Sequence, residues 1–317
     1  MRERRFANAA CELLKTKTGL IQSHERIPCC DIFRAGDGSH AAFIEHRSRG
    51  SRATSIFLRS HPYHRSVIAL EREMFTGKHL RAVIVNSQMV ADEIVRLYSV
   101  PPERIYQIPN GIDLNRFKPE MRGIHREIKR KELGTSASQP VLLFVGSGYK
   151  RKGLDTAIKS LSKSRSDAEL WVIGSDRNPG WYEAMAAPLG LSGRIRMIGP
   201  VKDPVPYYAA ADALILPTVY DPFPSTVIEA MACGLPVITS TGCGAREAVS
   251  QFDPALIRDA FDVDGYADAI CRALDHAAKS ATISAVRAIA NDYGIDPMID
   301  RMLGIYQKLA AQGGARN

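Results

Sequence analysis

The chain has 317 residues, of which 45% are hydrophobic and 24% charged, a composition typical of a globular protein with room for two domains. It has no run near the roughly 18 apolar residues that span a membrane, and its N-terminus lacks the apolar core of a secretion signal. We therefore expect a cytoplasmic protein. The six cysteines form no C-x-x-C pair, so we expect reduced, mostly buried thiols and no metal site.

The net charge of +8 is concentrated in the first half of the chain. Residues 1–138 hold 24 Lys and Arg against 15 Asp and Glu, whereas residues 139–317 hold 18 against 19. Six arginines recur beside apolar residues in one stretch: Arg47, Arg49, Arg52, Arg59, Arg65 and Arg72. This pattern is typical of a surface that binds anionic lipid or a phosphorylated substrate, and a solvated face explains it equally well. Because no nucleic-acid-binding signature accompanies the charge, we expect no nucleic-acid partner.

The first half shows few strand patterns, at 19–23, 30–34, 82–86 and 104–108. Helical patterns occur between them, so we predict a doubly wound domain with about four parallel strands. The stretch from Asn110 to Pro140 has an Asn-Gly turn, many charges and then small polar residues, as interdomain connections do. We place the boundary near residue 135, which makes 1–135 the first domain.

The second half alternates short β runs with helices. The predicted strands are at 141–147, 169–174, 195–199, 213–217 and 236–240. This alternation predicts βαβ units and a parallel sheet, within a second domain over 136–294. The residues 295–317 contain an amphipathic helix, which we expect to pack back on the first domain.

The stretch "LPTVYDPFPSTVIEAMACGLPVITS" joins a strand end to a helix start. Its prolines fit a helix beginning, and Ser225 and Thr226 suit a first turn, so the helix N-terminus is open to an anionic ligand. Asp221 and Glu229 flank that turn, and carboxylates accept hydrogen bonds from sugar hydroxyls. The motif indicates a phosphate-containing ligand with hydroxyls on both sides. The alternative is an exposed Asp and a surface Glu, but Glu229 lies in an otherwise apolar helix, which favours the ligand-binding interpretation.

A second strand end carries "GSGYKRKGLD", in which a small loop beginning at Gly146 precedes three cations. Backbone amides, cations and a helix N-terminus together form an anion cradle. A basic turn before a helix is more often simply solvated, so this pattern alone is weak.

Taken together, "IPNGIDLNRFKP", "VGSGYKRKGLD", "YDPFPSTVIEAMACGLPVITS" and "GAREAV" resemble the retaining glycosyltransferases of family four over roughly residues 20–250. The resemblance implies the GT-B fold, with two doubly wound Rossmann-like domains facing a cleft. Within the family, "FRAGDGSHAAF", "EREMF" and "GYKRKGLD" most resemble the members that add the first glucose to the lipopolysaccharide core.

The resemblance also implies roles for donor-binding residues. Arg151 and Lys152 match the cationic pair that binds the donor diphosphate, and Glu229 matches the acid that binds the ribose. The remaining positions implied at the donor are Gly146, Phe223, Ser225 and Thr226.

Two carboxylates are implied to be catalytic. Asp221 takes the first place of the family's E-x7-E motif and would contact the donor sugar, although it is one methylene shorter than the usual Glu. Asp37 matches a first-domain carboxylate that assists the acceptor hydroxyl. Since no D-x-D motif lies in a suitable loop, we expect no metal and no cofactor beyond the nucleotide-sugar substrate.

We therefore predict transfer of a hexose, glucose from UDP-glucose, to a lipopolysaccharide core or another glycan or glycolipid, with retention. The predicted partners are that donor, that acceptor and the anionic inner face of the cytoplasmic membrane. A nucleotide-sugar epimerase and a non-catalytic nucleotide-sugar binder are the alternatives. The chain begins with the helix-like "RERRFANAACELLK", not with a strand and a glycine-rich loop, so we expect an incomplete first domain. Donor binding with poor transfer would follow, unless the sequence belongs to a longer protein.

Overall fold

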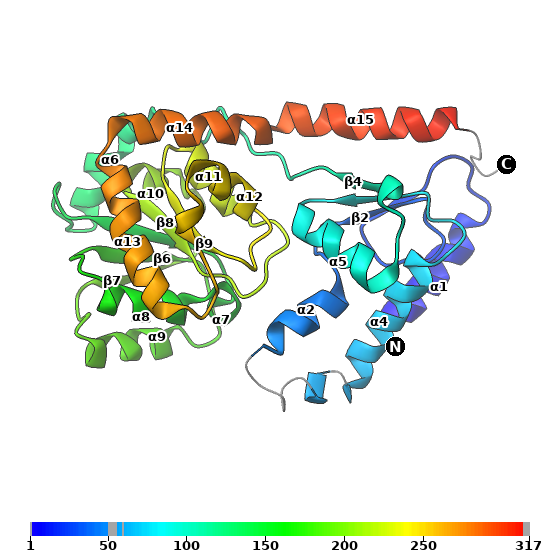
Figure 1. Ribbon diagram of the computed structural model, residues 1–317, viewed down its shortest axis with the longest axis horizontal. Coiled ribbons are helices and arrows are strands. Elements are labelled where there is room, and N and C mark those ends of the chain that lie inside the picture. The colour runs from blue at the N-terminus through cyan, green and yellow to red at the C-terminus, as the bar shows by residue number, and fades with distance from the viewer. Residues whose placement is uncertain (1, 50–55, 59, 313–317) are drawn as a thin grey trace. The chain divides into compact units, whose positions relative to one another are not determined.

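The computed structural model describes residues 2–49, 56–58 and 60–312 (Figure 1). It divides into unit 1, Met1–Asn110 with Asp296–Asn317, and unit 2, Gly111–Ile295. The division falls well before residue 135, because α6 (Met121–Glu132) packs on α10 (Val205–Ala210) within unit 2. In the described part of the chain, no helix is both long and apolar enough to cross a membrane.

Unit 1 contains a sheet of four parallel strands in the order β1-β2-β3-β4. The strands are β1 (Gln22–Ser23), β2 (Ile32–Ala35), β3 (Ala82–Val85) and β4 (Ile105–Gln107). This is the number of parallel strands that the sequence predicts, and it makes the first sheet the smaller of the two.

Helices cover both faces of the first sheet (Figure 1). They are α1 (Arg2–Leu14), α2 (His40–Arg47), α4 (Pro62–Phe75), α5 (Gln88–Tyr98) and α15 (Ile295–Ala311). Helix α15 packs Met302, Ile305 and Leu309 against strand side chains that include Ile32 and Ile84. The ring of Phe33 points to the opposite face, where it contacts Phe75 of α4.

Two of the six arginines in the basic stretch, Arg52 and Arg59, lie outside the described residues. The other four lie on α2, on α4 or just after α2, and Arg65 and Arg72 of α4 are exposed.

Unit 2 contains six parallel strands in the order β10-β9-β8-β5-β6-β7. They are β5 (Val141–Val145), β6 (Glu169–Ile173), β7 (Ile195–Gly199), β8 (Ala213–Leu216), β9 (Val237–Ser240) and β10 (Ile257–Arg258). From β5 the chain adds β6 and β7 on one side and then returns to add β8, β9 and β10 on the other. The winding direction therefore reverses between β5 and β8, which makes the sheet doubly wound, as predicted.

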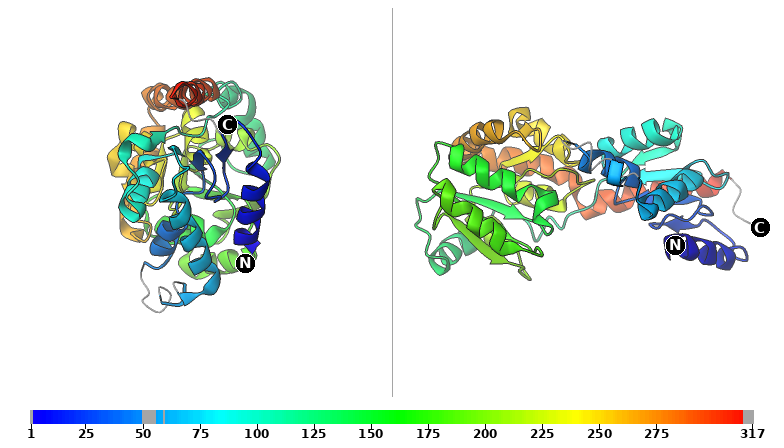
Figure 2. Two further views of the ribbon diagram at one scale, coloured as in Figure 1. Left: turned by 90° about the vertical axis from the view of Figure 1, so that its right-hand side faces the viewer. Right: turned by 90° about the horizontal axis from the view of Figure 1, so that it is seen from below.

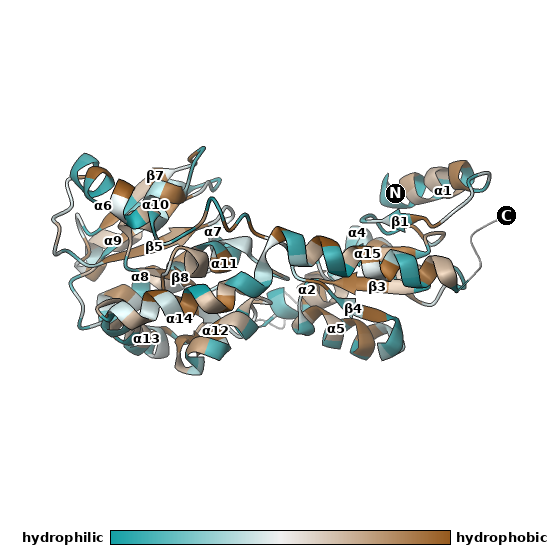
Figure 3. Ribbon diagram, turned by 90° about the horizontal axis from the view of Figure 1, so that it is seen from above, coloured by the Kyte–Doolittle hydropathy of each residue, from teal (hydrophilic) through white to brown (hydrophobic). Residues whose placement is uncertain are grey.

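Helices pack on both faces of this second sheet (Figure 2). Besides α6 and α10 they are α7 (Tyr149–Lys152), α8 (Leu154–Lys163), α9 (Pro179–Ala186), α11 (Ser225–Ala232), α12 (Arg246–Phe252), α13 (Val263–Ala277) and α14 (Ser280–Ala290). Because both faces are covered, every residue of β5, β6 and β8 is buried. Figure 3 shows the hydrophobic strands between helices that are hydrophilic on one side.

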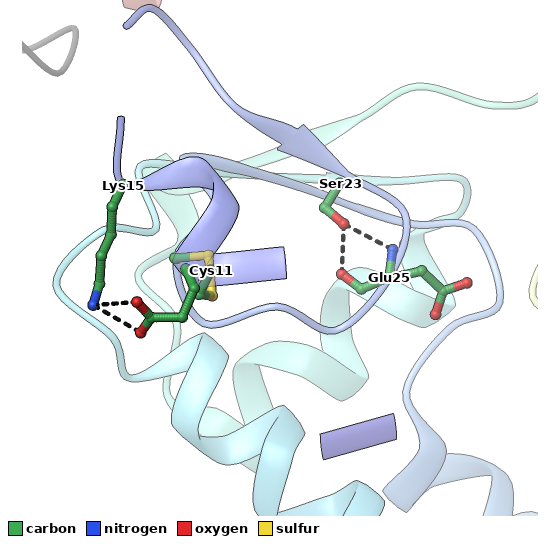
Figure 4. The surroundings of a disulfide bond; sticks show 6 residues. Cys11, Lys15, Ser23 and Glu25 are labelled. Atoms are coloured by element: carbon green, nitrogen blue, oxygen red, sulfur yellow. Dashed lines mark hydrogen bonds and ion pairs between the residues drawn. A yellow bond between two sulfur atoms is a disulfide. The ribbon is translucent and has the colours of Figure 1, made fainter. Parts of the chain in front are cut away.

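A disulfide joins Cys11 of α1 to Cys29 in the loop before β2 (Figure 4). The prediction that all six cysteines are reduced is therefore wrong for this pair. The two residues are 18 positions apart and belong to no motif, so only the folding of α1 beside that loop brings them together. The other four cysteines are not in disulfide bonds, and three of them are buried.

Candidate functional site

The candidate site lies at the carboxyl ends of β5 and β8, where the winding of the second sheet reverses. In open α/β sheets this reversal leaves a crevice in which ligands bind. Lys152 ends the short helix that follows β5, and Asp221 follows β8. Both residues are only 8% exposed, and the Lys152 ammonium donates a hydrogen bond to Asp221 Oδ2.

Arg151 adds a second cation to the same carboxylate. Its Nη1 donates to Asp221 Oδ2 at 3.2 Å and to the carbonyl oxygen of Tyr220 at 3.3 Å. The Arg151 side chain is 44% exposed, whereas that of Lys152 is 10% exposed. One buried cation and one accessible cation therefore converge on a single carboxylate.

Two glycines make this arrangement possible. A Cβ atom at Gly146 would lie 3.2 Å from Cγ of Lys152, so the lysine stem packs directly over that backbone. At Gly153, φ is +78° and a Cβ atom would lie 2.0 Å from the carbonyl oxygen of Pro217. Only glycine fits there without displacing the end of β8.

The backbone of Asp221 is fixed by the loop after β9. Its N–H donates to Gly242 O at 3.0 Å, and its carbonyl accepts from Gly244 N–H at 2.8 Å. Asp221 is thus fixed by the ends of three neighbouring strands. Its backbone follows β8 and is hydrogen-bonded to the loop after β9, and the two cations that bind its carboxylate follow β5.

The loop from Asp221 leads into α11, whose first two residues are Ser225 and Thr226. Its N-cap residue, Pro224, makes no capping hydrogen bond through its side chain. Thr226 Oγ1 is buried and has no hydrogen-bond partner among the described residues. The ring of Phe223 stacks on Tyr293 with centroids 6.0 Å apart, which anchors the loop.

Glu229 lies one turn along α11 and is partly buried. The hydroxyl of Tyr208 on α10 donates a hydrogen bond to Glu229 Oε2 at 2.8 Å. Burial raises the pKa of Glu229, while the Tyr208 hydrogen bond and the charge of Arg116 oppose that rise. Burial, reinforced by the Glu229 charge, raises the pKa of Tyr208 well above its usual range, so the phenol remains a donor.

The structure brings Gly146, Arg151, Lys152 and Asp221 into one cluster. Phe223, Ser225, Thr226 and Glu229 follow on the attached loop and helix. Asp37 belongs to unit 1, where its exposed side chain lies on the turn between β2 and α2. In the ranges that the structure describes, no three His, Cys, Asp or Glu side chains gather so as to hold a metal ion.

Two residues of the site were missed by the sequence analysis. Tyr208 belongs to an apolar segment that is typical of a core helix, and nothing in that segment indicates its contact with Glu229. Asp176 follows β6, and its carboxylate accepts from the N–H of Tyr149 at 2.7 Å, at the start of the helix that carries Lys152. A charged residue directly after a predicted strand was the available signal for Asp176.

Comparison with known sequences defines the class of protein. The family described as "Glycosyl transferases group 1" matches residues 125–287, and "Glycosyltransferase Family 4" matches residues 20–116. The first match covers more than half of the chain. The chain therefore belongs to the group 1 glycosyltransferases of family 4, and its two parallel sheets are those of a GT-B fold.

Among individual relatives, the lipopolysaccharide glucosyltransferase WaaG of Escherichia coli is 29% identical over 236 residues, which are 73% of this chain and 61% of that protein. The D-inositol 3-phosphate glycosyltransferase of Xylanimonas cellulosilytica is 29% identical over 74% of this chain and 58% of its own length. The chain thus spans about three fifths of these two relatives.

Solved structures share the fold. The crystal structure of WaaG superposes with a TM-score of 0.74 at 25% identity, covering 90% of this chain and 77% of WaaG. Anabaena Alr3699/HepE in complex with UDP-glucose superposes with a TM-score of 0.66 at 20% identity, covering 96% and 82%.

The raised pKa of Glu229 predicts a pH-dependent stability. Between the usual pKa of a glutamate, about 4.3, and the raised value, the folded state binds more protons than the unfolded state. The contribution of Glu229 to the free energy of unfolding therefore falls as pH rises through this window. Glu229→Gln removes the titrating group, so the variant should gain stability relative to wild type as pH increases.

Urea unfolding of both proteins across this pH range measures the difference. The exposed Glu183 of the same unit provides the control, because Glu183→Gln should show no such trend. A stability difference between Glu229→Gln and wild type that does not change with pH would contradict the account.

Proposed function

We propose that the chain transfers a hexose, glucose from UDP-glucose, to a lipopolysaccharide core or another glycan or glycolipid, with retention at the anomeric carbon. The observation that carries this proposal is the buried Lys152–Asp221 pair, with Arg151 beside it, at the crevice of a group 1 glycosyltransferase fold. The resemblance of "FRAGDGSHAAF" to enzymes of the lipopolysaccharide core supports the acceptor class.

The charges account for the leaving group. Breaking the bond between the anomeric carbon and the phosphate oxygen leaves a nucleoside diphosphate that carries new negative charge. Lys152 and Arg151 stabilise that charge from one side, and the uncapped first turn of α11 stabilises it from the other. A preorganised site of this kind lowers the barrier because the positive groups are already in place.

The carboxylates account for sugar recognition. When phosphate oxygens replace Asp221 as the hydrogen-bond partner of Lys152, the Asp221 carboxylate becomes available to accept hydrogen bonds from the hydroxyls of the hexose. Glu229 already accepts one hydrogen bond from Tyr208, and its remaining lone pairs are proposed to accept from the ribose hydroxyls.

Asp37 is proposed to contact the hydroxyl of the acceptor that attacks the donor sugar. Its carboxylate is exposed on the turn after β2 and can accept a proton or a hydrogen bond from the acceptor hydroxyl. In this scheme the hydroxyl oxygen bonds to the anomeric carbon on the face that the diphosphate leaves.

Replacing Lys152 tests the donor site. We expect Lys152→Ala to weaken UDP binding by about 2–4 kcal/mol, because a charge-assisted hydrogen bond in a partly dry site is lost. Isothermal titration calorimetry measures the affinity. The exposed neighbour Lys150 is the matched control, and Lys150→Ala should have a much smaller effect.

Unchanged UDP affinity in a folded Lys152→Ala protein would remove this residue from the site. An assay of UDP release from UDP-glucose in the presence of a lipopolysaccharide-core acceptor then distinguishes a transferase from a protein that only binds the donor. Tight donor binding without acceptor-dependent release would favour the non-catalytic alternative.

We also propose that unit 1 binds an anionic membrane surface, which is where a glycolipid acceptor would be found. The exposed arginines Arg65 and Arg72 lie on α4, and two large apolar side chains precede that helix, Ile56 at 69% and Phe57 at 68% exposure. Cations beside exposed apolar groups are typical of proteins that bind the interface of anionic bilayers.

Vesicle binding tests this surface. Sedimentation with anionic phospholipid vesicles should retain the protein at low salt and release it at high salt, because exposed charges are screened over about 8–10 Å at physiological ionic strength. Substituting both Arg65 and Arg72 with Gln should weaken retention, whereas Lys163→Gln in unit 2 should not. Equal retention on neutral vesicles would contradict the proposal.

A further inference from the structure

Unit 1 contains a buried carboxylate, Glu71, that the proposed function does not use. It lies on α4 and is only 1% exposed. Five donors surround it: Arg26 Nε at 2.9 Å, the His40 N–H at 2.6 Å, the Ala41 N–H at 3.2 Å, the Tyr98 hydroxyl at 2.5 Å and the Ser39 hydroxyl at 3.4 Å. These donors come from the β1–β2 loop, the start of α2 and the end of α5.

This arrangement stabilises a charge that would otherwise be costly to bury. A carboxylate taken out of water loses several kcal/mol of solvation unless ionic and hydrogen-bonding partners replace it. Here Arg26 supplies the opposite charge, and the two amides at the start of α2 add the favourable end of a helix dipole. Tyr98 remains a donor because burial and the Glu71 charge raise the pKa of its phenol well above the usual range.

The same contacts fix the turn that carries Asp37. Only residues 36–38 separate β2 from the Ser39 cap of α2. The sheet holds the first end of this turn, and Asn86 Nδ2 donates to the Gly36 carbonyl at 2.8 Å. Glu71 holds the other end through the amides of α2. A three-residue turn fixed at both ends leaves little freedom for Asp37.

Glu71 also holds one wall of a pocket. A cavity of about 350 Å³ lies beside α1 and α4, and its lining includes Arg26 and His40, two of the Glu71 partners, with Phe6, Tyr63 and Leu70. Burial lowers the pKa of His40 to about 4, so its imidazole is neutral at neutral pH, and its Nε2 lies 2.9 Å from His64 Nδ1. Planar polar groups beside aromatic and aliphatic side chains suit a hydroxyl-rich sugar ring.

We propose that Glu71 is a positioning residue: it holds the start of α2 and Arg26 so that the Asp37 turn and this pocket together receive a sugar unit of the acceptor. The proposal rests on the proposed function. Glu71 touches no substrate itself and acts through the backbone of α2 and through Arg26.

The test compares Glu71→Gln with Glu73→Gln. Glutamine keeps the size of the side chain but places an amide N–H₂ among donors and removes the charge. Glu73 is the matched control, since it lies on the same helix, has a side chain that is 49% exposed and pairs only with Arg4 among the contacts of the described chain. Glu71→Asp, which keeps the charge, is the rescue variant.

We expect three results for Glu71→Gln. Amide hydrogen exchange across residues 36–44 should accelerate by roughly tenfold or more, because the buried contacts that close the start of α2 are lost. Transfer should lose kcat by at least roughly tenfold, with UDP affinity and the KM for UDP-glucose unchanged, since the donor groups lie in unit 2. Glu71→Asp should recover part of both losses, and Glu73→Gln should match wild type.

Unchanged exchange at residues 36–44 in Glu71→Gln would overturn the proposal, and so would faster exchange with unaltered transfer. If Glu71→Gln does not fold, the exchange and kcat of Glu71→Asp decide in its place. A wild-type chain that binds no UDP, or binds it without transferring sugar, would overturn the proposed function instead. The exchange rates would then decide alone whether Glu71 holds the turn.

Discussion

The candidate donor site is organised around one buried ion pair. Lys152 and Asp221 lie 69 positions apart in the sequence, yet each is 8% exposed and the two side chains are hydrogen-bonded. Removing Asp221 would leave the Lys152 ammonium away from water without its carboxylate partner, which is strongly unfavourable. An anion that replaces Asp221 at the ammonium keeps the charge paired. In the proposed mechanism, a diphosphate therefore replaces Asp221 as the partner of Lys152, and phosphate binding releases a carboxylate for the sugar.

Both units use the same construction at their candidate sites. A strand ends, a short turn follows, a helix begins, and a carboxylate from elsewhere in the chain fixes the local geometry. In unit 2, Asp176 caps the helix that carries Lys152. In unit 1, Glu71 caps the helix that follows Asp37. The candidate residues Asp37 and Lys152 thus lie on a turn and on a one-turn helix, and carboxylates from other segments hold both in place.

The sequence predicts the regular elements well, because β5, β6 and β8 are continuous apolar runs bounded by turn residues, the pattern of strands that are covered on both faces. It does not predict β10, where Ile257 and Arg258 belong to no apolar run and no alternating pattern. The Cys11–Cys29 disulfide also escapes prediction, because neither its spacing nor a motif marks it. At the candidate sites, too, the sequence predicts some residues and not others. Motifs identify Lys152, Asp221 and Glu229, but the partners Tyr208 and Glu71 act across the fold, where local sequence carries no information about contact.

The most direct test of the ion-pair account is the affinity of Asp221→Asn for inorganic pyrophosphate, UDP and UDP-glucose, measured by calorimetry against wild type. Asparagine keeps the shape of the side chain but no longer competes as an anion for Lys152. The account predicts that the variant binds pyrophosphate more tightly than wild type does, while UDP-glucose loses its advantage over UDP because the hexose hydroxyls lose their charged acceptor. Pyrophosphate affinity that is unchanged or weaker in the folded variant would contradict the claim that Asp221 holds Lys152 in place of the donor diphosphate.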